Sequence, residues 1–214
     1  MTDVRTVATP HGDARLHTDR ARSPIATLLL NHGAGGGVDA PDLVALARDL
    51  PREGITVLRL EQPWRVAGRR VAPAGKVLDE CLVGVADRLR PRTPLVLGGR
   101  SAGARSACRS AHHLGASGVL ALSFPLHPPG RPGTTRVEEL TAVSVPVLVV
   151  QGERDPFGRP DEFPPGPPVV VVPGGDHGLA VPKRGVLSQA DVWGLVVEAA
   201  LEFIVRDVVG NRPG

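Results

Sequence analysis

The sequence predicts a three-layer α/β/α sandwich built on a mostly parallel sheet. Runs that are apolar throughout, such as residues 26–33 and 94–99, are typical of strands buried on both faces. Segments with apolar residues on one helical face lie between these runs. Strands and helices that alternate in this way build a parallel sheet that helices cover on both sides.

Two weakly alternating segments, 4–8 and 13–18, flank "PHG" near the start of the chain and predict an N-terminal hairpin. The other strands are expected at 26–33, 55–60, 94–99, 118–124, 146–150 and 168–172. Parallel strands end at the same edge of a sheet, so the residues that follow them should gather there. In the second half of the chain, most glycines, prolines and histidines fall at that edge.

The helices are indicated by apolar residues at helical spacing. The second is expected at 78–89, and the third follows Ser101 and should end at Gly115. The last should begin after Ser188, which can form a capping box with Asp191. The first helix carries Leu43, Leu46, Ala47 and Leu50, and the last carries Trp193, Val196, Val197, Ala200, Leu201 and Ile204.

Length and composition indicate one globular domain. A chain of 214 residues is long enough for a single core, which we expect over 1–208, with 209–214 as a disordered tail. With four Phe, two Trp and no Tyr, the chain is poor in the aromatic side chains that stack on single-stranded nucleic acid. The net charge of +3 comes from arginines spread along the chain. We therefore expect no nucleic-acid partner.

The two cysteines, Cys81 and Cys108, have neither CxxC spacing nor the number that a disulfide scaffold needs, which suits a reducing compartment. We expect both to lie in the core. No segment is apolar enough for a signal peptide or a membrane span, so a cytoplasmic protein without membrane association is expected. No two histidines have the spacing of metal ligands, and neither a metal nor a cofactor is expected.

The segment Gly99-Arg100-Ser101-Ala102-Gly103 fits the pattern G-x-S-x-G, between a predicted strand and a predicted helix. A chain that turns at once from strand to helix holds the turning residue in a strained conformation, which only small neighbours allow. Its hydroxyl then projects clear of the backbone. The first N–H of the helix, that of Ala102, and the helix dipole can stabilise negative charge beside it.

A serine nucleophile needs a base that is itself oriented by an acid. His177, in "GGDHG" after the last strand, is the best-placed base. Asp155, in "GERDPFG" after the preceding strand, is the preferred acid. Asp176 competes with it, but immediate neighbours rarely fold back to meet each other. Glu153 is weaker still, because it lies within the turn.

The loop "HGAGGG", residues 32–37, follows the first central strand and should supply a second N–H for an oxyanion. Ala34 is preferred for this role and Gly35 is the alternative, while His32 is expected to brace the loop. The same glycines allow a dinucleotide-binding interpretation, with Glu61 as the acidic residue after the next strand. Val38 stands where that motif needs its third glycine, which disfavours this alternative.

The segments "HGAGGG", "GGRSAGARSA", "SFPLHPPGRP", "GERDPFG" and "DHGL" together resemble the α/β-hydrolase-like proteins of the KANL/Tex type, near the dienelactone-hydrolase branch. The resemblance spans residues 28–203. It implies an α/β-hydrolase fold with Ser101, Asp155 and His177 at the triad positions. Dienelactone hydrolases use cysteine where this chain has Ser101. Some relatives in this group are subunits of larger assemblies.

The prediction is a serine hydrolase that cleaves an ester or related acyl bond of a small-molecule substrate. The alternative is a non-catalytic binding or scaffold protein on a hydrolase fold. Residues 125–144 leave room for one short helix near 137–140, so we expect no lid domain and an open cleft. Arg65, Arg100 and His127 are candidate substrate-binding residues, with Arg69, Arg70 and Arg131 near the same edge. The sequence is compatible with a monomer or a homodimer.

Overall fold

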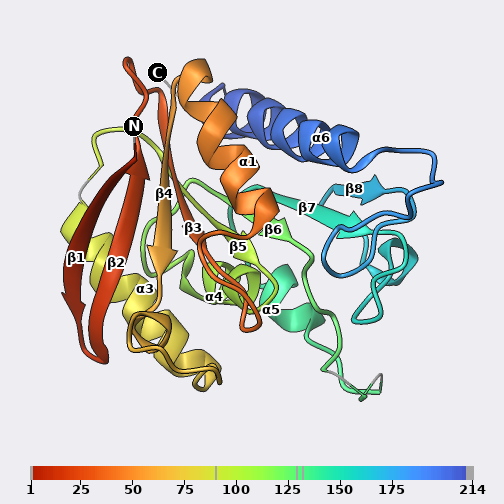
Figure 1. The fold of residues 1–214 in the computed structure, drawn as a ribbon, viewed down its shortest axis with the longest axis horizontal. Helices are drawn as coiled ribbons and strands as arrows, with labels where there is room; N and C mark the ends of the chain where they lie inside the picture. Colours follow the sequence, from red (N-terminus) through yellow and green to blue (C-terminus); the bar gives the residue numbers. More distant parts are fainter. Residues whose placement is uncertain (1, 90, 129, 132, 211–214) are drawn as a thin grey trace.

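The computed structural model describes residues 2–89, 91–128, 130–131 and 133–210. Its strands form one sheet in the order β1-β2-β4-β3-β5-β6-β7-β8 (Figure 1). Only the pairings β1–β2 and β2–β4 are antiparallel, and β4 through β8 are parallel. This arrangement confirms the predicted fold class. The strands are β1 (Asp3–Thr9), β2 (Gly12–Asp19), β3 (Ala26–Asn31), β4 (Ile55–Glu61), β5 (Leu95–Arg100), β6 (Gly118–Leu122), β7 (Val147–Gly152) and β8 (Val169–Val172).

Helices cover both faces of this sheet, as the fully apolar strands require (Figure 1). In β3, Leu28 and Leu30 join one apolar cluster, while Leu29 between them joins the other. The first cluster includes side chains of α1 (Pro41–Asp49) and α6 (Gln189–Glu202). The second includes side chains of α3 (Gly75–Leu89), α4 (Ala102–Ser110) and α5 (Val137–Thr141).

Shorter helical segments complete the chain. They are η1 (Leu50–Glu53), α2 (Pro63–Val66), η2 (Pro160–Glu162) and η3 (Phe203–Val209). Only α5 forms a helix between β6 and β7, so no lid domain covers the carboxyl edge of the sheet within the described residues. Among those residues, no helix has both the length and the apolarity to cross a bilayer.

The C-terminal helix begins where the sequence predicts it, and the helical chain continues past Ile204, the last residue of the predicted apolar face. The Ser188 side chain accepts from the Asp191 N–H at 3.2 Å, and the Asp191 carboxylate accepts from the Ser188 N–H at 2.9 Å. After α6 the chain continues as the π-helical segment η3, which buries Ile204 and Val208 against the sheet. Val209 is therefore still helical, and 211–214 of the predicted tail lie outside the described residues.

Strand β6 is shorter than the predicted 118–124. It ends at Leu122 because Ser123 has a left-handed backbone, with φ of 47°. Ser123 still donates its N–H to the Val150 carbonyl at 2.8 Å. The side chain of Phe124 is fully buried, so the loop after β6 starts against the sheet.

Candidate active site

Ser101 forms the sharp turn between β5 and α4, with φ of 54° and ψ of −114°. A residue with a Cβ adopts this region only at a cost of roughly 1–3 kcal/mol, which the surrounding packing must offset. Here the flanking glycines allow that packing. A Cβ at Gly99 or at Gly103 would overlap the backbone carbonyl of Asn31, at the end of β3. The chain can therefore turn this tightly only with glycine at both positions.

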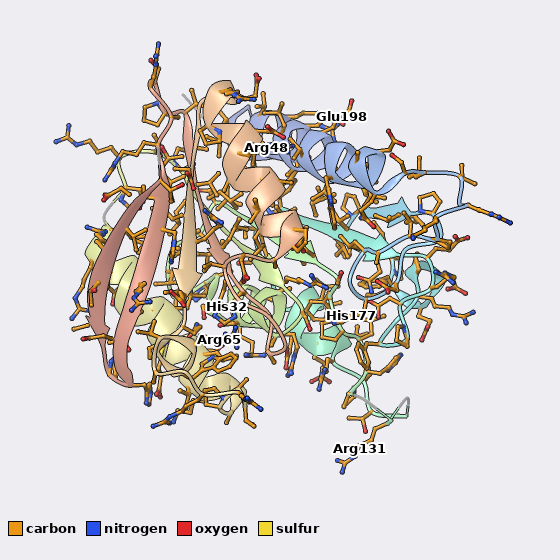
Figure 2. The ribbon with its side chains drawn as sticks, in the orientation of Figure 1. His32, Arg48, Arg65, Arg131, His177 and Glu198 are labelled. Carbon is orange, nitrogen blue, oxygen red and sulfur yellow. The ribbon has the colours of Figure 1, made fainter. Side chains whose placement is uncertain are left out.

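The turn brings Ser101 to His177. His177 lies in the loop between β8 and α6 (Figure 2). The Ser101 Oγ is 2.9 Å from His177 Nε2, and His177 Nδ1 is 2.7 Å from Asp155 Oδ2. A carboxylate accepts, so Nδ1 carries the ring proton and Nε2 is left to accept from the serine hydroxyl. The ring also packs edge-on against Phe157, with centroids 4.5 Å apart. The three residues form one continuous hydrogen-bonded chain.

Asp155 is fully buried, and three donors surround its carboxylate. The Gln151 amide donates to Oδ2 at 2.9 Å, and the Phe157 N–H donates to Oδ1 at 2.8 Å. Gln151 also donates to the Gly158 carbonyl at 2.7 Å, which ties the loop to the end of β7. These contacts fix the orientation of the carboxylate toward His177. Sequence reasoning missed Gln151, although a glutamine ending an apolar run was a visible signal.

The two competing acids have other partners. Asp176 Oδ1 accepts from the Gly178 and Ala180 N–H groups at 2.7 and 2.9 Å, which closes the turn that carries His177. Glu153 accepts from the Gly174 N–H at 2.6 Å. Both therefore shape the loops around His177, and of the three candidate acids only Asp155 contacts the imidazole.

Two residues beside the serine have backbone N–H groups without an acceptor in the described part of the chain. These residues are Ala34 and Ala102. Both residues line the cleft that contains Ser101. The loop of Ala34 lies against the serine turn, where a Cβ at Gly33 would be 3.4 Å from the Ser101 Cβ. This arrangement has the composition of an oxyanion hole.

His32 holds that loop in place. Its Nδ1 bonds to the Gly33 carbonyl at 2.9 Å, and the Gln62 N–H donates to Nε2 at 3.2 Å. A carbonyl only accepts and an N–H only donates, so the ring is neutral with its proton on Nδ1. Burial lowers the pKa of His32, which agrees with a neutral bracing role.

The predicted substrate-binding residues lie elsewhere. The Arg100 guanidinium donates to the His177 carbonyl at 2.8 Å and lies 3.7 Å from the buried Asp42 carboxylate. His127 bonds to Glu162 at 2.9 Å and to the Thr134 carbonyl at 3.2 Å. Arg65 lies over the Trp64 ring, 5.5 Å from its centroid. None of the three is among the described residues that line the cleft, because each is held by a partner outside it.

The cleft at Ser101 has a volume of about 290 Å³ and contains a different set of arginines. Arg105 and Arg109 come from α4, and Arg136 comes from the residue before α5. Sequence reasoning missed all three. Arg105 follows Ser101 by four residues, and helical spacing alone would have placed it on the face below the serine. Arg136 had no comparable signal, because a long loop brings it back to the cleft.

A second hollow of about 730 Å³ adjoins this cleft, and the two share Ala72 and Pro73. Its other lining residues are mainly apolar side chains of α2, α3 and the loop between them, among them Trp64, Val66, Val71 and Val77. Among the described residues, no three His, Cys, Asp or Glu side chains are grouped as metal ligands would be.

Both cysteines are free and buried, as expected. Burial raises the pKa of the Cys108 thiol to about 12, and also raises that of Cys81. Neither thiol is therefore activated as a nucleophile.

Comparisons with known proteins identify the fold and the family of this chain. Residues 24–205 match the model of a family described as the alpha/beta hydrolase domain. A lidless a/b serine hydrolase from Xanthomonas campestris is 23% identical, with a TM-score of 0.75 over 99% of this chain and 97% of that one. Est1E from Butyrivibrio proteoclasticus is 14% identical, with a TM-score of 0.75 over 96% and 98% of the two chains.

A dienelactone hydrolase from Anabaena variabilis is 16% identical, with a TM-score of 0.74 over 97% of this chain and 98% of that one. At these identities the solved structures establish the shared fold, and the family match covers most of the chain. The chain is therefore a hydrolase of the alpha/beta hydrolase domain family.

Proposed function

We propose that the protein is a serine hydrolase that cleaves an ester or related acyl bond through Ser101, His177 and Asp155. The observation that carries this proposal is the hydrogen-bonded chain of 2.9 Å from serine to imidazole and 2.7 Å from imidazole to carboxylate. These distances are those of a nucleophile paired with a general base. The family match establishes a hydrolase, and the arrangement of these side chains supports the finer assignment.

In the first half of the reaction, Ser101 Oγ attacks the substrate carbonyl carbon while His177 Nε2 takes the hydroxyl proton. The carbonyl oxygen becomes an oxyanion, which the N–H groups of Ala34 and Ala102 stabilise. The imidazolium then gives its proton to the departing alcohol oxygen as the carbon–oxygen bond breaks. An acyl-enzyme remains on Ser101.

In the second half, His177 Nε2 removes a proton from a water molecule that attacks the acyl carbon. The tetrahedral intermediate collapses, the acid leaves, and the proton returns to Ser101 Oγ. Asp155 acts throughout by holding the imidazole in the Nδ1–H tautomer and by stabilising the imidazolium. Its burial and its three donors keep it in place for this role.

The cleft favours small substrates that reach it directly from solvent. No lid covers it within the described residues, and its volume of about 290 Å³ suits a compact acyl compound. The lidless serine hydrolase from Xanthomonas campestris shares this open arrangement by its description.

Labelling with a fluorophosphonate probe tests the proposal, because the probe reacts only with an activated serine. We expect labelling of the wild type and complete loss of it in Ser101→Ala. Ser123→Ala is the matched control: Ser123 also follows a central strand with a left-handed backbone, but its buried hydroxyl has no base beside it. It should label like the wild type. A folded wild-type protein that does not label would overturn the proposal in favour of a non-catalytic binding protein.

A further inference from the structure

The three arginines of the cleft differ in whether a carboxylate pairs with them. Arg105 forms a bidentate pair with Glu139, with contacts of 2.8 and 2.5 Å. Arg109 forms a bidentate pair with Asp79 at 2.8 Å through both nitrogens, and a further bond of 2.8 Å to Glu139. The two carboxylates are therefore already neutralised by the two guanidinium groups of α4.

Arg136 is the third guanidinium of this group, and it pairs with no carboxylate among the described residues. Its Nη1 donates to the Pro125 and His127 carbonyls at 3.5 and 3.3 Å, which are weak contacts. No acceptor in the described part of the chain takes its Nε or Nη2. The side chain is half-buried, and burial together with the nearby Arg105 lowers its pKa. Glu139 attracts it from nearby but is already bonded to Arg105 and Arg109, so the three guanidinium groups and two carboxylates keep one positive charge in excess. An unpaired charge is unfavourable in a half-buried position.

This excess charge lies in the cleft that contains the proposed nucleophile. Arg136, Arg105, Ser101 and Ala102 line the same small cleft. Arg105 lies one helical turn beyond the serine, a rise of about 6 Å along α4. A substrate whose acyl carbon is at Ser101 therefore needs a chain of only a few bonds to reach Arg105, and Arg136 lines the same cleft.

We propose that this cleft binds a substrate carboxylate at Arg136, so that the preferred substrates are esters that carry a second, free carboxylate. The proposal rests on the serine hydrolase function above and names its substrate class. A guanidinium fork matches a carboxylate in shape and in donors. A substrate anion would supply the acceptor that Arg136 Nε and Nη2 lack, while Arg105 adds a second favourable charge.

Two pairs of substrates that differ in charge test the proposal. The first is 4-nitrophenyl hydrogen adipate and its methyl ester, which place the charge in the acyl part about 6 Å from the reacting carbon, the rise of one helical turn. The second is 4-acetoxybenzoate and its methyl ester, which place the charge in the leaving group. We expect the anionic member of at least one pair to have the higher kcat/KM, by about tenfold or more. Equal values within both pairs would overturn the carboxylate site.

The variant Arg136→Gln should reduce the anionic-to-neutral ratio of kcat/KM about tenfold, mainly through KM of the anionic ester. Arg136→Lys should restore part of it, since it keeps the charge without the fork. Arg131→Gln is the matched control. Arg131 lies on the same loop but is exposed and points away from the body of the molecule (Figure 2), so its variant should keep the wild-type ratio. A ratio that Arg136→Gln leaves unchanged contradicts the proposal.

Binding of adipate, measured by calorimetry, separates this proposal from the proposed hydrolysis. Wild type and Arg131→Gln should bind it, and Arg136→Gln should bind about tenfold more weakly. Protein that labels with the fluorophosphonate probe but neither binds adipate nor prefers anionic esters retains the hydrolase function and loses the carboxylate site. Protein that binds adipate through Arg136 but never labels loses the hydrolase function and retains the anion site.

Discussion

The two sides of the cleft position their chemical groups by different means. On the nucleophile side, backbone is packed against backbone: the Asn31 carbonyl leaves no space for a side chain at Gly99 or at Gly103. On the acid–base side, the loops are held by side-chain hydrogen bonds, such as those from Gln151 to Asp155. The difference teaches that a strained turn depends on steric fit, whereas an acid and its base depend on donors and acceptors. Substitutions at the strained turn should lower the free energy of unfolding. Substitutions among the hydrogen-bonded acid and base should lower activity.

The largest effect expected is on the acid–base side. Asp155→Asn should reduce kcat by about 10⁴, because an amide in this position favours the wrong tautomer of His177. The change in the free energy of unfolding should be much smaller than the increase in activation free energy that corresponds to this loss in kcat. Steady-state kinetics on an activated ester would measure the loss, with thermal unfolding in parallel.

Asp176→Asn is the matched control for that change. Among the described residues, the Asp176 side chain accepts only from backbone N–H groups of its own turn, so its variant should keep activity to within about tenfold. Equal losses in the two variants would contradict the assignment of Asp155 as the partner of the imidazole.

Arg100 connects the two sides, because it precedes Ser101 and donates to the His177 carbonyl. It is also the nearest cation to Asp42, whose carboxyl is fully buried and has its pKa raised by that burial. Arg100→Met should therefore lower the free energy of unfolding by roughly 3 kcal/mol, since it leaves a buried carboxylate uncompensated. Denaturant unfolding would measure it. The double variant Arg100→Met/Asp42→Asn should recover part of the loss, and an additive double variant would refute the coupling.

Gly103→Ala tests steric fit on the nucleophile side. Its Cβ would overlap the Asn31 backbone carbonyl, which cannot move without disturbing β3. We expect a loss of about 1–3 kcal/mol in the free energy of unfolding, as for overpacked cores. Gly194→Ala is the control: it lies in α6 with open space around its Cβ position and should stabilise by up to about 1 kcal/mol. Similar stability changes in both would show that fit at Gly103 is unimportant.

The smallest effect concerns His32 and pH. Burial lowers the pKa of His32 in the folded protein, so the unfolded chain binds more protons below its ordinary value of about 6.5. Stability should therefore fall as the pH decreases from 7 to 5, by at most about 1.4 kcal/mol per pH unit from this group. Urea unfolding at several pH values would show a steeper slope for the wild type than for His32→Gln. Parallel slopes would mean that another group controls the acid transition.

Much of the fold and the triad could be predicted because both depend on local patterns. The apolar run of 94–99 predicts a buried strand, and glycines around Ser101 predict a tight turn into a helix. The carboxyl ends of parallel strands meet at one edge, so residues after successive strands are neighbours there. The sequence therefore predicts that Ser101, Asp155 and His177 lie close together, and their side chains are in hydrogen-bond contact.

The contacts of the arginine side chains could not be predicted in this way. Arg100 and His127 follow strands at the correct edge, but their side chains bind partners beside the cleft. A guanidinium can extend several ångströms in any direction, so its backbone position does not determine what it contacts. Arg136 reaches the cleft only because the loop after β6 folds back on itself, with the Arg136 N–H bonded to the Leu126 carbonyl at 2.8 Å.

The sequence by itself determined the order of strands and helices, the strained serine turn and the edge of the sheet at which the candidate site residues lie. Hydrophobic periodicity and glycine placement act over a few residues, so the sequence shows them directly. The tertiary structure alone decided that Gln151 holds Asp155, that Arg100 holds the loop of His177, and that Arg136 is left with an uncompensated charge. These outcomes depend on contacts between side chains far apart in the chain, and such contacts exist only once the core has packed.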